Sequence, residues 1–161
     1  MQDVRVLLTP AAFRGVAGTV IDNNPGMAEA TADRIVMEAL KFVVAAARFP
    51  TAKITPSSVV DEGWHALILH THLYRRLCQN LGRFVHHWPE RPDVTRRDVR
   101  ALTRTVAVIG QAGHTVDGEL WAGPDTGLLS VAANCSHTPK PGGCGPINPG
   151  NCASHCSGGG Q

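Results

Sequence analysis

Proline and glycine divide this chain into segments in which apolar residues recur at helical spacing. Thr9-Pro10 predicts the start of a first helix, because a hydroxyl residue caps a helix and proline suits its first position. The turn residues from Asn23 to Gly26 end that helix. A second helix is predicted from about Met27 to Phe49, where the residue before Pro50 disfavours helical backbone.

A third helix is predicted from about Ser58 to Asn80, with Gly82 as its stop, and a fourth after Pro92. For residues 114–121 the pattern is compatible with a turn and with a short helix. No series of strands is evident, so the predicted fold is all-α: a compact bundle of about four main helices over residues 1–133, followed by an irregular Gly/Pro/Cys-rich tail over 134–161. The expected buried face of the third helix comprises Val60, Trp64, Leu67, Thr71, Tyr74, Cys78 and Leu81.

Composition excludes several classes of function. The 161 residues suit one domain, and the net charge of +2 is scattered, so no nucleic-acid partner is expected. No run approaches the ~20 apolar residues of a membrane span, and the N-terminus lacks the apolar core of a secretory signal. A cytoplasmic protein without a membrane partner is therefore expected. Five cysteines in a reducing compartment favour metal ligation or redox chemistry over a disulfide framework.

The third helix carries a carboxylate and an imidazole one turn apart, Asp61 and His65. His86 and His87 follow the turn at Gly82 and could return to the same strip of that helix. Two imidazoles and one carboxylate can hold zinc, or iron with open positions. In the alternative interpretation, Asp61 caps the helix and orients His65 through a hydrogen bond, and the loop histidines satisfy backbone groups.

The tail holds four cysteines: Cys135, Cys144, Cys152 and Cys156. Four thiolates suit a tetrahedral zinc site, which would also fix a segment too poor in apolar residues to fold alone. Their gaps of eight, seven and three residues differ from the paired short gaps of zinc ribbons. Ligation, redox use and an incidental set of cysteines therefore all stay open.

The central motif resembles the glycine-rich domain-containing protein-like family, in particular its short bacterial members, over roughly residues 7 to 135. That resemblance implies a helical fold and no defined reaction. Short members tend to end in a Cys/His-rich tail, and the wider gaps here depart from that pattern. His70 and His72 lie outside the family motif and rank below the other histidines as ligands. The motif is carried by Asp61, Trp64, His65, Ile68, Leu69, Thr71, Tyr74, Cys78, Gly82, Phe84, His86, His87 and Pro89.

Three functions follow as hypotheses. The first is a small metal-binding helical protein, with zinc as the expected ion. The second is a metalloenzyme, with zinc or non-haem iron, acting on a peptide or small molecule. The third is an interaction or precursor protein, with a peptide or protein partner, whose Cys/Gly tail is modified or delivered.

Overall fold

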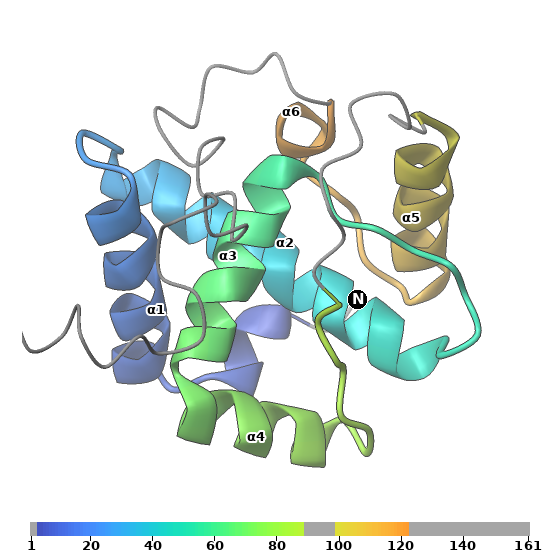
Figure 1. Ribbon diagram of the computed structural model, residues 1–161, viewed down its shortest axis with the longest axis horizontal. Helices are drawn as coiled ribbons and strands as arrows, with labels where there is room; N and C mark the ends of the chain where they lie inside the picture. Colours follow the sequence, from blue (N-terminus) through green and yellow to red (C-terminus); the bar gives the residue numbers. More distant parts are fainter. Residues whose placement is uncertain (1–2, 89–98, 123–161) are drawn as a thin grey trace, which may run out of the picture.

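The computed structural model describes residues 3–88 and 99–122, and within these ranges it is helical with no strand (Figure 1). The all-α prediction is confirmed for this part of the chain, whereas the tail and its four cysteines lie outside the described residues. The elements in chain order are the 3-10 helix η1 (Val4–Leu7) and the α-helices α1 (Pro10–Asn23), α2 (Glu29–Arg48), α3 (Ser58–Leu69), α4 (Thr71–Asn80), α5 (Val99–Gln111) and α6 (Gly118–Trp121).

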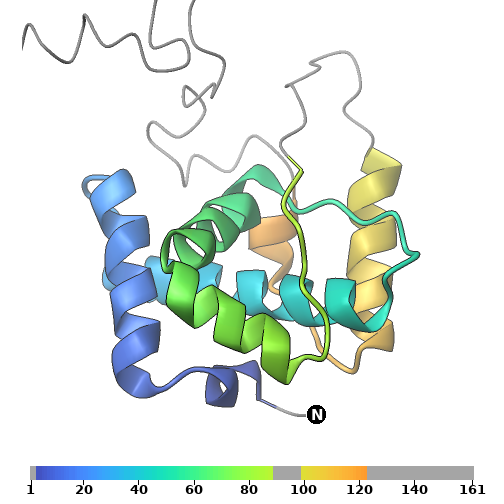
Figure 2. The ribbon, with the colours of Figure 1, turned by 60° about the horizontal axis from the view of Figure 1, so that its bottom comes forward.

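Helix α2 is the centre of the arrangement. It contacts η1, α1, α3 and α5, and Figures 1 and 2 show it running between α1 at one side and α5 at the other. Its apolar stripe explains this position, because side chains at three- and four-residue spacing face one way along a helix. The fully buried members of the stripe are Ala32, Ile35, Val36, Ala39, Leu40 and Val43.

Helix α3 approaches α2 closely at Gly63. A Cβ atom at this position would lie 2.8 Å from the Ile35 carbonyl oxygen and 3.0 Å from the Ala39 Cβ atom. Only glycine therefore permits this separation of the two helices. Because successive helical residues are rotated by about 100°, Asp61 and His65 lie on the side of α3 turned away from the contact.

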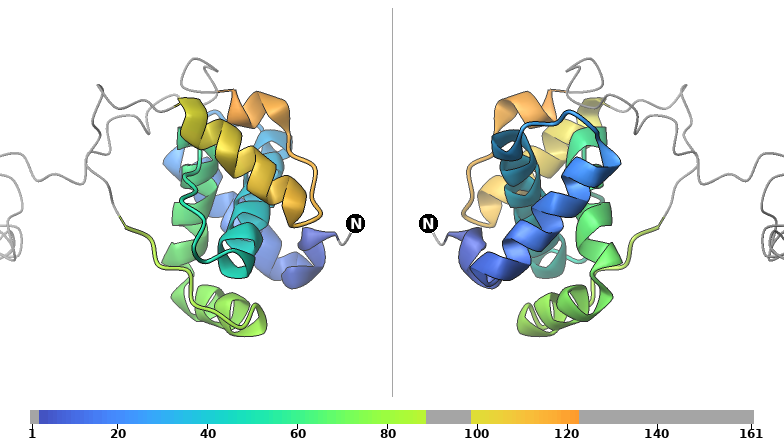
Figure 3. Two further views of the ribbon diagram at one scale, coloured as in Figure 1. Left: turned by 90° about the vertical axis from the view of Figure 1, so that its right-hand side faces the viewer. Right: turned by 90° about the vertical axis from the view of Figure 1, so that its left-hand side faces the viewer.

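The single long third helix of the prediction is wrong, since the chain breaks at His70 into α3 and α4. His70 has a non-helical ψ of 64°, and its ring Nε2 lies 2.9 Å from the Thr19 hydroxyl of α1. Figure 3 shows α4 leaving α3 at an angle. The turn at His70 lets α4 bury Tyr74, Leu77 and Cys78. No proline or glycine marks this break, so no local pattern predicts it. With this helix divided, five α-helices of ten or more residues occur among the described residues in place of the expected four.

Side-chain caps begin α1 and α3, one as expected and one not. Thr9 accepts a hydrogen bond from the backbone of Ala12 at the start of α1, as the sequence predicts. At the start of α3 the cap is Ser57, whose hydroxyl accepts from the Val60 amide at 3.2 Å. The interpretation of Asp61 as the capping side chain is therefore wrong, and its carboxylate is directed elsewhere.

The C-terminal end of the described chain is fastened to α2 by polar contacts. Glu38 is 1% exposed, accepts from the Trp121 indole at 2.7 Å and pairs with Lys41 at 2.5 Å. Arg34 pairs with Asp117, the cap of α6, at 2.7 Å. These contacts hold α6 on the helical body. Among the residues that the structure describes, no helix has both the length and the apolar character to cross a membrane.

Candidate metal centre

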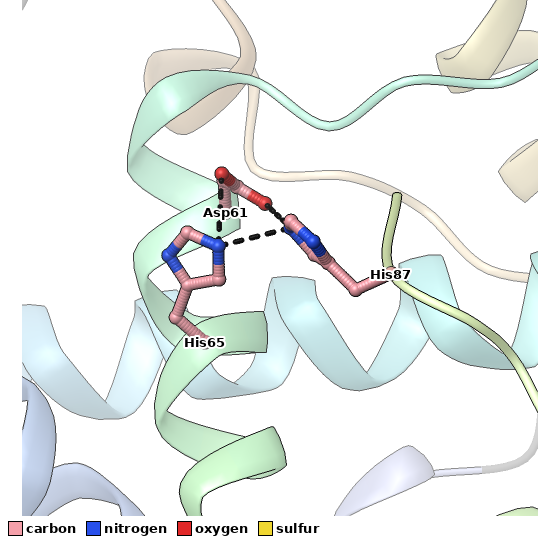
Figure 4. A group of neighbouring side chains, drawn as sticks. All are labelled: Asp61, His65 and His87. Carbon is pink, nitrogen blue, oxygen red and sulfur yellow. Dashed lines mark hydrogen bonds and ion pairs between the residues drawn. The ribbon is translucent and has the colours of Figure 1, made fainter. Parts of the chain in front are cut away.

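Three side chains from two parts of the chain converge beside α3. Asp61 and His65 project from successive turns of that helix, and His87 comes from the segment that follows α4 (Figure 4). Gly82 has a positive φ of 76°, a conformation that glycine adopts without strain, and it lets the chain turn back after α4. The expected return of the loop toward Asp61 and His65 is thus made by His87.

The ligand-type atoms of the cluster lie close together. The Nε2 atoms of His65 and His87 are 2.9 Å apart, and His87 Nε2 lies 3.1 Å from Asp61 Oδ1. The second Asp61 oxygen, Oδ2, lies 3.5 Å from His65 Nε2. One atom from each residue can be chosen so that all three lie within 4.8 Å of one another.

These separations match those of ligands around one ion. Zinc bonds of about 2.0–2.1 Å at the tetrahedral angle place neighbouring ligand atoms about 3.3 Å apart, and octahedral geometry at the same length places them about 3.0 Å apart. The 2.9 Å between the two nitrogens and the 3.1 Å from His87 Nε2 to Asp61 Oδ1 are close to these values, and the 3.5 Å from His65 Nε2 is to the other carboxylate oxygen, Oδ2. The cluster therefore needs only small side-chain adjustments to surround a cation.

Hydrogen bonds alone satisfy this cluster poorly. His87 Nε2 carries at most one hydrogen in any protonation state, yet it makes short contacts with both Asp61 and His65. If that hydrogen points to the carboxylate, the nitrogen has no lone pair for His65. If that hydrogen points to His65, the Asp61 oxygen lies close to His87 Nε2 without receiving a hydrogen bond from it. A cation at the centre would accept a lone pair from all three atoms.

The cluster lies at the edge of the core. The side chains of Asp61 and His65 are 30% and 31% exposed, and that of His87 is 18% exposed. The His87 ring packs on the ring of buried Trp64, with centroids 4.5 Å apart. Trp64 also packs on Phe42 of α2 at 4.9 Å, so the site rests on the hydrophobic core while its outer side meets solvent.

The two adjacent loop histidines have different environments. His87 joins the cluster, whereas His86 is exposed and packs between the rings of Phe84 and Trp88, at 4.7 and 6.2 Å. Of the two loop histidines that the sequence predicts, the structure thus brings only His87 to Asp61 and His65. Exposure alternates along residues 84–88, and Val85 and His87 face inward.

The remaining candidates lie elsewhere. His70 contacts Thr19, and His72 is exposed on α4. Cys78 is a free, buried thiol on the core side of α4, as expected for a small apolar residue. The four tail cysteines lie outside the described residues.

The sequence patterns do not predict the roles of two residues that support the site. Gly63 is not predicted by any local pattern, because its role depends on a contact between two helices, at Ile35 and Ala39. Tyr74 was expected to be a packing residue; it is 4% exposed, and its hydroxyl also joins α3 to the loop. Hydrophobic spacing places Tyr74 in the core but cannot identify the hydrogen bonds of its hydroxyl group.

Comparison with known proteins identifies a family. No curated protein and no solved structure matches the chain. The family described as UCP032817-like matches residues 7–105, which is more than half of the 161 residues and contains Asp61, His65 and His87. That description names no activity, ligand or partner, and the resemblance to the glycine-rich domain-containing family stays a prediction. The chain belongs to the UCP032817-like family.

Proposed function

We propose that this protein binds a divalent metal ion, zinc in the first place, through Asp61, His65 and His87. The observation that carries the proposal is the convergence of two imidazole nitrogens and one carboxylate from α3 and the loop, with closest contacts of 2.9, 3.1 and 3.5 Å. The donor set of two imidazoles and one carboxylate is typical of zinc and of non-haem iron centres. Both nitrogens are Nε2 atoms, a usual ligating position of histidine.

Zinc is preferred to iron on grounds of affinity. For a given set of nitrogen and oxygen ligands, divalent iron binds more weakly than zinc. The side chains of the site are not deeply buried, and a partly exposed site has little means of excluding the tighter-binding ion.

Three protein ligands leave at least one coordination position for another group. Water, a substrate or a thiolate from the tail would fill it. A position open to solvent also supports a second candidate function, a metalloenzyme in which the ion activates water or polarises a bound peptide or small molecule. The hypothesis of a modified or delivered tail depends on residues 134–161 and has no support from the described part.

The experiment that tests the proposal is metal analysis of the protein purified without chelator. His87→Ala and His65→Ala should each lose about one equivalent of metal per chain, because two ligands seldom retain zinc. The matched control is His86→Ala, which removes the neighbouring exposed imidazole and should keep the metal content of the unchanged protein. Equal metal content in His87→Ala and His86→Ala would contradict the proposed ligand set.

Substitution by cobalt would show which atoms complete the site. A cobalt ion held by nitrogen and oxygen gives visible d–d bands alone, whereas a thiolate ligand adds a charge-transfer band in the near ultraviolet. If that band appears and is lost in His87→Ala, a cysteine completes the same centre. If it persists in His87→Ala, the tail cysteines hold a separate ion.

A further inference from the structure

A buried pair of hydrogen bonds connects α3 to the loop that carries His87. The indole Nε1 of Trp64 donates to the Tyr74 hydroxyl at 2.9 Å, and that hydroxyl donates to the Val85 carbonyl oxygen at 2.6 Å. All three residues are buried, with exposures of 6%, 4% and 8%. The hydroxyl of Tyr74 is therefore the link between the helix beside the metal centre and the backbone of the loop.

This link lies next to the candidate ligands on both sides. Trp64 immediately precedes His65 and packs its ring on His87, while Val85 is two residues before His87. Fixing the Val85 carbonyl and the Trp64 ring together restricts both the backbone and the ring of His87. Burial raises the pKa of Tyr74 well above its usual value, so the hydroxyl keeps the proton that it donates.

Three other side chains of residues 84–88 are largely exposed. Phe84, His86 and Trp88 face solvent, with 47% and 79% of Phe84 and Trp88 exposed. The buried or half-buried side chains of the segment are those of Val85 and His87, and Phe84 makes an edge contact with the Tyr74 ring. Without the Tyr74 hydroxyl, the position of His87 would depend on its own ring contacts, on the side chain of Val85 and on the contact of Phe84 with the Tyr74 ring.

We infer that Tyr74 is a positioning residue of the metal centre: its hydroxyl holds the Val85–His87 backbone so that His87 Nε2 meets Asp61 and His65. The inference rests on the proposed metal site. Groups that orient ligands without touching the ion commonly change metal affinity by about 10–100-fold when they are removed. Pre-organisation of the loop explains such an effect, because an ordered ligand loses less freedom on binding.

The test is a double-mutant cycle of zinc affinity, measured by competition with a chromophoric chelator. The protein is the full chain with the tail cysteines changed to serine, so that thiolates contribute nothing. Tyr74→Phe keeps the ring and its edge contact with Phe84 and removes only the hydroxyl. It should raise the Kd for zinc about 10–100-fold. In a His87→Ala background, where only weak zinc binding remains, the same change should have no further effect on zinc binding.

A control separates positioning from stability alone. Ile109→Val alters a fully buried residue of α5 and should lower the melting temperature without changing the Kd. If Tyr74→Phe behaved like Ile109→Val, with normal zinc affinity, the inference would be overturned while the metal site stood. If the parent chain bound no zinc, or bound it equally well with His87→Ala, the proposed function would fall and the inference with it.

Discussion

Gly63→Ala tests how closely α3 must lie against α2. The added Cβ atom would lie 2.8 Å from the Ile35 carbonyl oxygen and 2.9 Å from its Cγ2 atom, and the carbonyl belongs to a helical backbone that cannot move alone. Overpacking of this kind costs about 1–3 kcal/mol, and contact with backbone favours the upper end. The higher helix propensity of alanine offsets part of this cost, by about 1 kcal/mol relative to glycine. The free energy of unfolding should therefore fall by about 2 kcal/mol.

The assay is urea denaturation followed by far-ultraviolet circular dichroism, with Gly18→Ala as the matched control. Gly18 lies within α1, and nothing within 4 Å would meet its Cβ atom, so the same substitution should stabilise by up to about 1 kcal/mol. The two variants should thus move in opposite directions. A Gly63→Ala protein as stable as Gly18→Ala would refute the close packing of α3 on α2.

Three further outcomes are expected. Trp64→Ala should lower the free energy of unfolding by about 3–5 kcal/mol, because it removes a buried ring that packs on two others; an unchanged melting curve would contradict its place in the core. Arg34 lowers the pKa of Asp117, so this ion pair stabilises the fold at neutral pH and the contribution is lost as the pH falls through the pKa of the folded state. Asp117→Asn should thus lower the free energy of unfolding by about 1 kcal/mol or less at pH 7. It should also make that free energy depend less on pH in the acid range, and the control is Asp22→Asn at an exposed position. Zinc should raise the melting temperature of the protein, because an ion that binds only the folded chain stabilises it, and an unchanged melting curve on addition of zinc would contradict the site.

Local sequence patterns predict much of the fold and part of the site. Thr9-Pro10 and the apolar spacing of α2 place those helices to within about two residues, because caps and amphipathic faces are local properties. At the break, His70 contacts Thr19 of a different helix, and no local pattern predicts such a contact. Asp61 and His65 are related by helical geometry alone and could be paired from sequence.

The partner of that pair could not be chosen in the same way. His86 and His87 are the same residue type in adjacent positions, and the choice between them depends on where the loop lies against α3. That placement depends in turn on the Tyr74 hydroxyl and on the Trp64 ring. The tertiary contacts that select His87 act across 10 to 23 residues of sequence, beyond the range of helical periodicity.

Because exposure alternates along residues 84–88, whether a histidine of this segment faces inward depends on how many residues separate it from Val85. With Val85 held by Tyr74, the inward side chain is the one two places later, and the residue between them faces outward. The doublet therefore provides no spare ligand, since His86 cannot replace a lost His87 from its own place in the chain. Inserting one residue between Val85 and His86 in a His87→Ala protein would move that imidazole into the inward place. A relative of this chain that lost His87 could therefore use the other histidine after a one-residue insertion. The loss of His87 by substitution alone would leave His86 facing outward.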